Sequence, residues 1–191
     1  MRFSYTAGMS QEFDPRRVPI QSFAKAAGRF AGEERLARFG RLIAETRGLG
    51  AESMVSYEFS GELRKDAAGQ DEPWLHLSAQ ACLPLVCQRC LGPVEVVLQV
   101  ERDFRFVATE ELAAVEDEES EEDVLVTSRA FDVLDLAEDE LLMAIPVSPM
   151  HEVCPVPVSM EVVDPDFDGQ GEQRPHPFAA LAKLRKDNDP V

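Results

Sequence analysis

The chain has 191 residues, 45% of them hydrophobic, so it can bury one sizeable core and we expect one principal domain. Its longest apolar runs are too short to span a bilayer, and its first residues lack the apolar segment of a secretory signal. We therefore expect a cytoplasmic protein that does not bind a membrane. The net charge of −17 disfavours nonspecific binding to RNA or DNA, so we also expect no binding to DNA.

The charge is unevenly distributed along the chain. Residues 1–50 contain nine Lys and Arg against five Asp and Glu, whereas residues 51–191 contain ten against thirty-one. A basic protein is the more natural partner for an acidic body, but an acidic surface is also a common way to keep a protein soluble. Composition leaves both interpretations open.

Two helical patterns come first. Residues 20–28 predict a short helix that ends at Gly28, and residues 33–48 predict a longer one with its apolar positions on one face. The basic residues Arg35, Arg38 and Arg41 fall together on the outer face of this second helix. The stripe could contact phosphate, although a basic helix face that meets only solvent is the commoner outcome.

From residue 52 the apolar pattern takes a period of two, which predicts strands. Residues 74–86 and 94–106 both alternate apolar and polar side chains, and the sequence CQRC joins them, as expected for an antiparallel hairpin. Pro84 cannot donate to a strand ladder, so the first of the two should be near an edge or bulged there. Residues 53–59 and 124–128 predict two further strands.

Acidic residues dominate the middle of the chain. Because like charges repel one another, the sequence EDEESEED predicts an acidic mobile loop over about residues 108–123. A helix of about ten residues should follow, with Asp135 and Glu138 forming a capping box at its start and Pro146 after its end.

The last part of the chain predicts a flexible linker over residues 164–176 and a C-terminal helix over residues 177–187. The predicted fold is therefore one α+β domain over residues 1–163, followed by a tethered helix. Its sheet should be antiparallel and could close into a barrel, with helices on the N-terminal side and one central helix.

The strongest chemical pattern is a pair of spaced ligands. Cys87 and Cys90 form a C-x-x-C at the hairpin tip, where Gly92 should supply a positive φ, and His151 and Cys154 repeat the spacing after the central helix. Together they make a Cys₃His set that suits a closed, structural zinc site. Buried inert thiols are the close alternative, whereas redox chemistry is less favoured because the pair does not begin a helix.

We expect no enzymatic activity. The sequence has no Gly-rich phosphate loop, no G-x-S-x-G and no H-E-x-x-H. His76 shares a strand face with Trp74, and His176 stands where the N-cap of the last helix is expected. No histidine is therefore clearly free to act as a base, and no catalytic residue is assigned.

Three stretches, CQRCLGPV, LDLAEDELLMAIPVSPMHEVC and HPFAALAKLRK, resemble in that order the signature stretches of the bacterial YceD family, the large ribosomal RNA subunit accumulation proteins. The resemblance extends from about residue 13 to the final helix, with His176 where the family usually has Asn. It implies a role in the synthesis, processing or stability of large-subunit ribosomal RNA. Genes of this family often neighbour the gene of a small basic large-subunit ribosomal protein.

The resemblance and the charge together favour a non-enzymatic ribosome-biogenesis factor. Our hypothesis is an adaptor whose acidic body holds a basic large-subunit ribosomal protein or a ribosome precursor. In this hypothesis Arg35, Arg38 and Arg41 contact ribosomal RNA or simply face solvent. The alternative is a protein that binds ribosomal RNA directly or processes it as a nuclease.

Overall fold

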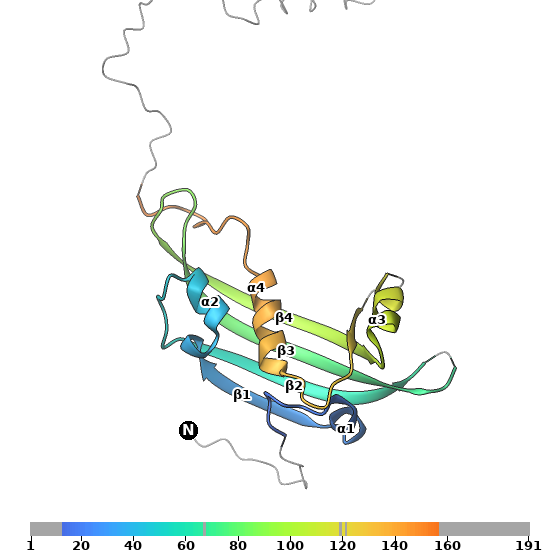
Figure 1. Ribbon diagram of the computed structural model, residues 1–191. Helices are drawn as coiled ribbons and strands as arrows, with labels where there is room; N and C mark the ends of the chain where they lie inside the picture. Colours follow the sequence, from blue (N-terminus) through green and yellow to red (C-terminus); the bar gives the residue numbers. More distant parts are fainter. Residues whose placement is uncertain (1–12, 67, 119, 121, 157–191) are drawn as a thin grey trace, which may run out of the picture. The chain divides into compact units, whose positions relative to one another are not determined.

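Five strands form a mixed sheet in the order β1-β2-β3-β4-β5 in a computed structural model that describes residues 13–156 except 67, 119 and 121 (Figure 1). The first four strands pair antiparallel with their sequence neighbours, and β5 pairs parallel with β4. The strands are β1 (Arg29–Arg35), β2 (Met54–Lys65), β3 (Asp71–Val86), β4 (Pro93–Val107) and β5 (Asp123–Val126).

Four α-helices and one 3₁₀ helix accompany the sheet in the described residues. They are α1 (Ile20–Lys25), η1 (Leu36–Arg38), α2 (Gly40–Glu45), α3 (Glu110–Asp117) and α4 (Val133–Met143). This confirms the predicted α+β class, although the sheet stays open, with β1 and β5 as its edges. The predicted domain end at residue 163, the linker over 164–176 and the helix over 177–187 lie outside the described residues.

The two faces of the sheet differ because side chains alternate along each strand. One set of positions, which we call the inner face, holds the buried apolar residues of the core and packs under α1, α2 and α4 (Figure 1). Its fully buried strand residues include Val55, Phe59, Leu75, Leu77, Leu83, Phe104 and Phe106.

The opposite set of positions, which we call the outer face, is mostly polar and exposed. Within the described residues α3 covers it only where β4 meets β5, through a small cluster of Val107, Ala113 and Val124. This division fits the predicted alternation in β2, β3 and β4. The core therefore lies between the inner face and three helices, and residues 13–156 leave most of the outer face uncovered.

The helix predicted over residues 33–48 is wrong in its first half. Residues 29–35 form the edge strand β1, and α2 begins only at Gly40. Gly32 pairs with Tyr57 so closely that a Cβ at residue 32 would lie 2.6 Å from the Tyr57 hydroxyl. Non-local pairing with β2 thus overrides the helix propensity of the Glu and Arg residues.

The acidic segment also differs from its prediction. Residues 110–117, which were expected in a loop, form α3, because the Thr109 hydroxyl accepts from the Leu112 N–H and acidic residues occupy the favourable first turn. The central helix α4 exists as predicted, but its N-cap is Asp132 rather than Asp135. Pro84 lies beyond the last residues of β3 that pair with β2, so it has a strand neighbour on one side only, as expected near an edge.

Candidate metal site

The hairpin between β3 and β4 ends in a tight turn that carries the first two candidate ligands. The Cys87 N–H donates to the Gly92 carbonyl at 2.9 Å, and the Leu91 N–H donates to the Cys87 carbonyl at 2.8 Å. Leu91, with φ of 60°, takes the left-handed conformation that was expected at Gly92. This turn brings Cys87 and Cys90 to the same side of the tip.

The second pair of candidate ligands follows the end of α4. The Gln88 N–H donates to the Pro149 carbonyl at 2.8 Å, which fixes the segment after α4 against the hairpin tip. As a result the Sγ atoms of Cys87 and Cys154 lie 4.0 Å apart, and Cys90 Sγ lies 3.4 Å from His151 Nδ1. The two spaced pairs, 61 or more residues apart in sequence, meet at one point.

The geometry of the four side chains fits one tetrahedral ion. Their ligand atoms all lie within 4.8 Å of one another. Ligand atoms about 2.0–2.3 Å from a tetrahedral zinc lie roughly 3.5–3.8 Å from each other, close to the observed 3.4 and 4.0 Å. A disulfide would need a sulfur separation of about 2.05 Å, and all four cysteines are free.

The imidazole of His151 is already oriented for a metal. Its Nε2 lies 2.9 Å from the Pro93 carbonyl oxygen, which can only accept a hydrogen bond. The neutral ring therefore carries its proton on Nε2, and the lone pair on Nδ1 faces the sulfur of Cys90. A second-shell hydrogen bond of this kind is the usual way in which proteins fix a ligating histidine.

The electrostatics of the cluster favour bound positive charge. Burial opposes ionisation of Cys87, but the backbone N–H groups of Cys90, His151 and Arg89 outweigh it and lower the pKa of the Cys87 thiol to about 5. The Gly92 N–H also favours a Cys90 thiolate, yet burial and the neighbouring sulfurs raise the pKa of Cys90. The surroundings thus favour the thiolate of Cys87 and disfavour that of Cys90, and a bound cation would favour both.

Arg89 also stabilises the cluster, and the spacing of the four candidate ligands in the sequence does not reveal this role. Its Nε donates to Cys154 Sγ at 3.0 Å, and its Nη2 donates to the His151 carbonyl at 2.7 Å. The guanidinium therefore holds the second ligand pair in place and adds positive charge beside the sulfurs. Arg89 lies between the two cysteines of the C-x-x-C, and only the assembled turn shows that it faces the other pair.

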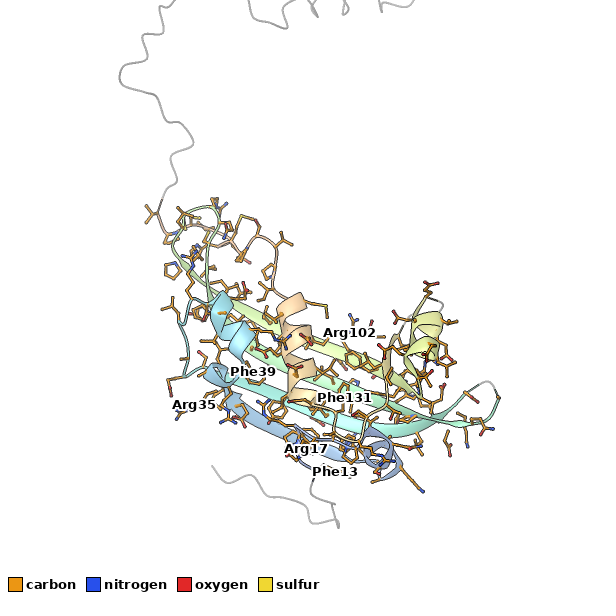
Figure 2. The ribbon with its side chains drawn as sticks, viewed as in Figure 1. Phe13, Arg17, Arg35, Phe39, Arg102 and Phe131 are labelled. Carbon is orange, nitrogen blue, oxygen red and sulfur yellow. The ribbon has the colours of Figure 1, made fainter. Side chains whose placement is uncertain are left out.

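Arg35, Arg38 and Arg41, which were predicted to share one helix face, lie on three different elements. Arg35 ends β1, where it points into solvent (Figure 2) and pairs with Glu52 at 3.1 Å. Arg38 belongs to η1 and lies 3.9 Å from Glu34.

Arg41 lies on α2 and is surrounded by acids. It contacts Asp135 at 2.7 Å, Glu138 at 3.3 Å and also Asp139, all on α4. Each of the three arginines thus has an acidic partner, and no common helix carries them. The prediction of a shared helical stripe is wrong.

The described residues contain one further histidine with a fixed geometry. His76 lies on the outer face, where its Nδ1 contacts Asp103 at 2.7 Å, as part of a set of ion pairs that includes Arg64. It shares this face with Trp74, as predicted. No helix in the described residues is long and apolar enough to cross a membrane.

Comparison with known proteins shows which protein family the chain resembles. It matches the family model described as large ribosomal RNA subunit accumulation protein YceD over residues 75–185, a range that includes most of β3, all of β4 and α4, and all four residues of the cluster. It is 33% identical over 111 residues to the large ribosomal RNA subunit accumulation protein YceD of Haemophilus influenzae.

That alignment covers 56% of this chain and 62% of the relative, so the chain spans less than two thirds of the relative's length. No solved structure matches the chain significantly. The family match covers more than half of the chain and contains both halves of the Cys₃His cluster. The chain belongs to the YceD family of large ribosomal RNA subunit accumulation proteins.

Proposed function

We propose that the chain supports the accumulation of large-subunit ribosomal RNA during ribosome biogenesis and catalyses no reaction itself. Membership of the YceD family carries this proposal, because the Haemophilus influenzae relative bears that function in its name. Depletion of the protein should lower the ratio of large-subunit to small-subunit ribosomal RNA, and re-expression should restore it. An unchanged ratio after depletion would contradict the proposal.

The proposed mechanism is that of an adaptor for a basic large-subunit ribosomal protein. Two observations support it: the acidic excess beyond residue 50, and the acidic partners of Arg35, Arg38 and Arg41, which leave little positive charge for RNA. Purified protein should bind at least one large-subunit ribosomal protein, and the complex should weaken as salt rises. Binding to precursor ribosomal RNA alone, or its cleavage, would instead favour the RNA-binding or nuclease alternative.

The proposed cofactor is one structural zinc ion held by Cys87, Cys90, His151 and Cys154. The distances among the four ligand atoms and the orientation of His151 support this choice over inert thiols. A closed site without an open position would link the β3–β4 tip to the end of α4. Because metal binding stabilises the fold that forms the site, chelation should lower the melting temperature.

Metal analysis tests the zinc site directly. Protein purified without added metal should contain about one equivalent of zinc. Cys90→Ser should lose it, whereas Cys82→Ser is the matched control because Cys82 lies on the outer face and is not part of the cluster. Less than about a tenth of an equivalent in the unmodified chain would reject the site.

A further inference from the structure

The outer face is divided into a charge-compensated end and an uncompensated middle. At the end near the β2–β3 turn, Arg64 contacts Glu62 and also Asp103 at 3.0 Å. Beside it, Arg105 contacts Glu72 at 3.2 Å and also Glu116 of α3. Most carboxylates at this end of the outer face therefore have an arginine partner.

The middle of the outer face has carboxylates without such partners. We call this the acidic patch, and it consists of the exposed residues Glu33, Glu58 and Glu101 and, nearer the hairpin tip, the exposed Glu95, which accepts a hydrogen bond from Cys82 Sγ at 3.0 Å. Among the described residues none of the four forms an ion pair with Lys or Arg, and Glu101 approaches only His76, at 3.7 Å. Between them lie short or neutral polar side chains, namely Ser56, Ser78, Gln80 and Gln99.

The strand register sets the dimensions of the acidic patch. Glu58 pairs with Ser78, which in turn pairs with Glu101, so the two carboxylates belong to strands on either side of β3. With strands about 4.8 Å apart, they are about 10 Å apart, and the patch runs about 20 Å along β4. An α-helix about 10–12 Å wide fits this footprint, and basic residues seven positions apart on it are about 10.5 Å apart.

Two other occupants fit the patch poorly. RNA would bring phosphates to unpaired carboxylates, and the ring on which a base could stack, Trp74, is covered by the Arg64 guanidinium at 4.0 Å from its centroid. A second copy placed face to face would oppose its own acidic patch, which like-charge repulsion disfavours.

Exposed Val97 offers apolar surface that suits the aliphatic stem of Lys or Arg.

A buried donor on the same face has no acceptor. Among the described residues the indole Nε1 of Trp74 is buried without a hydrogen-bond partner, and the residue is only 9% exposed. Trp74 pairs with Glu62 and Arg105, so this donor lies at the charge-compensated end of the outer face and not within the acidic patch.

We propose that the acidic patch is the docking surface for a Lys/Arg-rich helical segment of the basic ribosomal protein. This inference rests on the adaptor function proposed above and gives it a location. Positive charges of the segment lie over Glu58 and Glu101, and a further part of it packs on Val97, four residues away along β4. The interaction is sensitive to salt because the carboxylates that carry it are exposed.

The test compares two double substitutions in the full-length chain. Glu58→Lys with Glu101→Lys reverses two charges of the acidic patch. Glu118→Lys with Glu122→Lys makes the same change in net charge in the acidic segment near α3, where both residues are exposed. The probes are a basic alanine-based helical peptide of about 20 residues, which spans about 30 Å, and purified large-subunit ribosomal proteins.

Binding is followed by calorimetry and by the fluorescence of Trp74, the one tryptophan in the sequence. The patch variant should bind both probes at least about tenfold more weakly, and the control variant should change the affinity by less than about twofold. The variant Glu58→Gln with Glu101→Gln should also weaken binding while circular dichroism and melting temperature stay unchanged, which separates lost binding from lost folding.

Other results overturn the inference in distinguishable ways. If the unmodified chain binds the probes and the patch variant binds them equally well, the location is wrong while the adaptor function stands. Equal weakening by both double substitutions would mean that only net charge matters, which also rejects the patch. If the unmodified chain binds neither probe, the adaptor function fails and the patch fails with it.

Discussion

The inner and outer faces of the same three long strands serve different purposes. On the inner face, residues such as Phe59 and Leu77 are fully buried under the helices, and Glu138 of the covering helix α4 buries a carboxylate against the start of α2. On the outer face, Ser78 and Glu58 are exposed in the neighbouring positions. One strand can therefore hold the fold together with every second residue while the residues between them stay exposed to solvent.

The largest expected effect comes from the centre of the inner face. Phe59 is 0% exposed and packs against Phe30 at a ring-centroid distance of 5.1 Å. Phe59→Ala should lower the free energy of unfolding by about 3–5 kcal/mol, because it removes buried area and leaves a cavity. Ser78→Ala on the outer face should change it by less than about 0.5 kcal/mol. Urea unfolding of both variants checks this, and similar losses would break the distinction between the faces.

A smaller effect is expected at the buried carboxylate of Glu138. Its Oε1 accepts from the backbone N–H of Arg41 at 2.6 Å and of Leu42 at 3.1 Å, at the start of α2. Glu138→Ala should destabilise the chain by about 2–3 kcal/mol, since it leaves these donors and Arg41 without their partner. Glu58→Ala, the matched carboxylate on the outer face, should stay within about 0.5 kcal/mol. Thermal melts that rank the two variants the other way would contradict this assignment.

A pH dependence should distinguish the outer face. Burial disfavours the charged form of Asp103, but hydrogen bonds from His76 and Arg64 outweigh it, so the pKa of Asp103 lies below its ordinary value of 3.8. The unfolded chain therefore binds this proton more tightly, and the stabilisation is complete above the ordinary pKa and lost as the pH falls through the lower one. Asp103→Asn should reduce the loss of stability in acid by about 1 kcal/mol or less, because the side chain is 35% exposed. Unfolding curves that fall equally steeply below pH 4 in both proteins would contradict it.

The smallest effect has the opposite sign and belongs to α4. Burial raises the pKa of Glu140, Arg102 opposes the shift, and Asp123 and Asp139 add to it. The folded chain therefore holds this proton more tightly than the unfolded chain, so the contribution is favourable in acid and is lost as the pH rises through the raised pKa. Glu140→Gln should be as stable as the unmodified chain at neutral pH or more stable, by under about 1 kcal/mol. A clear loss of stability at neutral pH would show that the contact with Arg102 dominates instead.

The sequence predicts those parts of the fold in which local signals agree. Strands β2, β3 and β4 follow from strict alternation, and α4 follows from its apolar positions and the proline after it, although the predicted cap Asp135 is not its N-cap. The Cys₃His cluster follows from two equal spacings, which need no knowledge of the path between them. These features are encoded within short windows of the chain.

The rest depends on contacts between distant residues. β1 has helix-forming residues and becomes a strand only because Gly32 and its neighbours pair with β2. The parallel pairing of β5 with β4 cannot be predicted from a four-residue strand. For α3 a signal was present, since Thr109 precedes two glutamates, but the charge of the following segment obscured it. The role of Arg89 depends on which groups the finished turn faces.

The consecutive order of β1 to β4 also affects the order in which contacts form during folding. Neighbouring strands in the sheet are neighbours in sequence, so most of the sheet can form from contacts of short sequence separation. Two contacts need a far longer loop to close, namely the hydrogen bond from Gln88 to Pro149 and the one from Arg89 to the His151 carbonyl. We expect both to form after the rate-limiting step of folding. Loss of the long-range contacts of Arg89 should therefore alter the lifetime of the folded chain far more than the speed at which it forms.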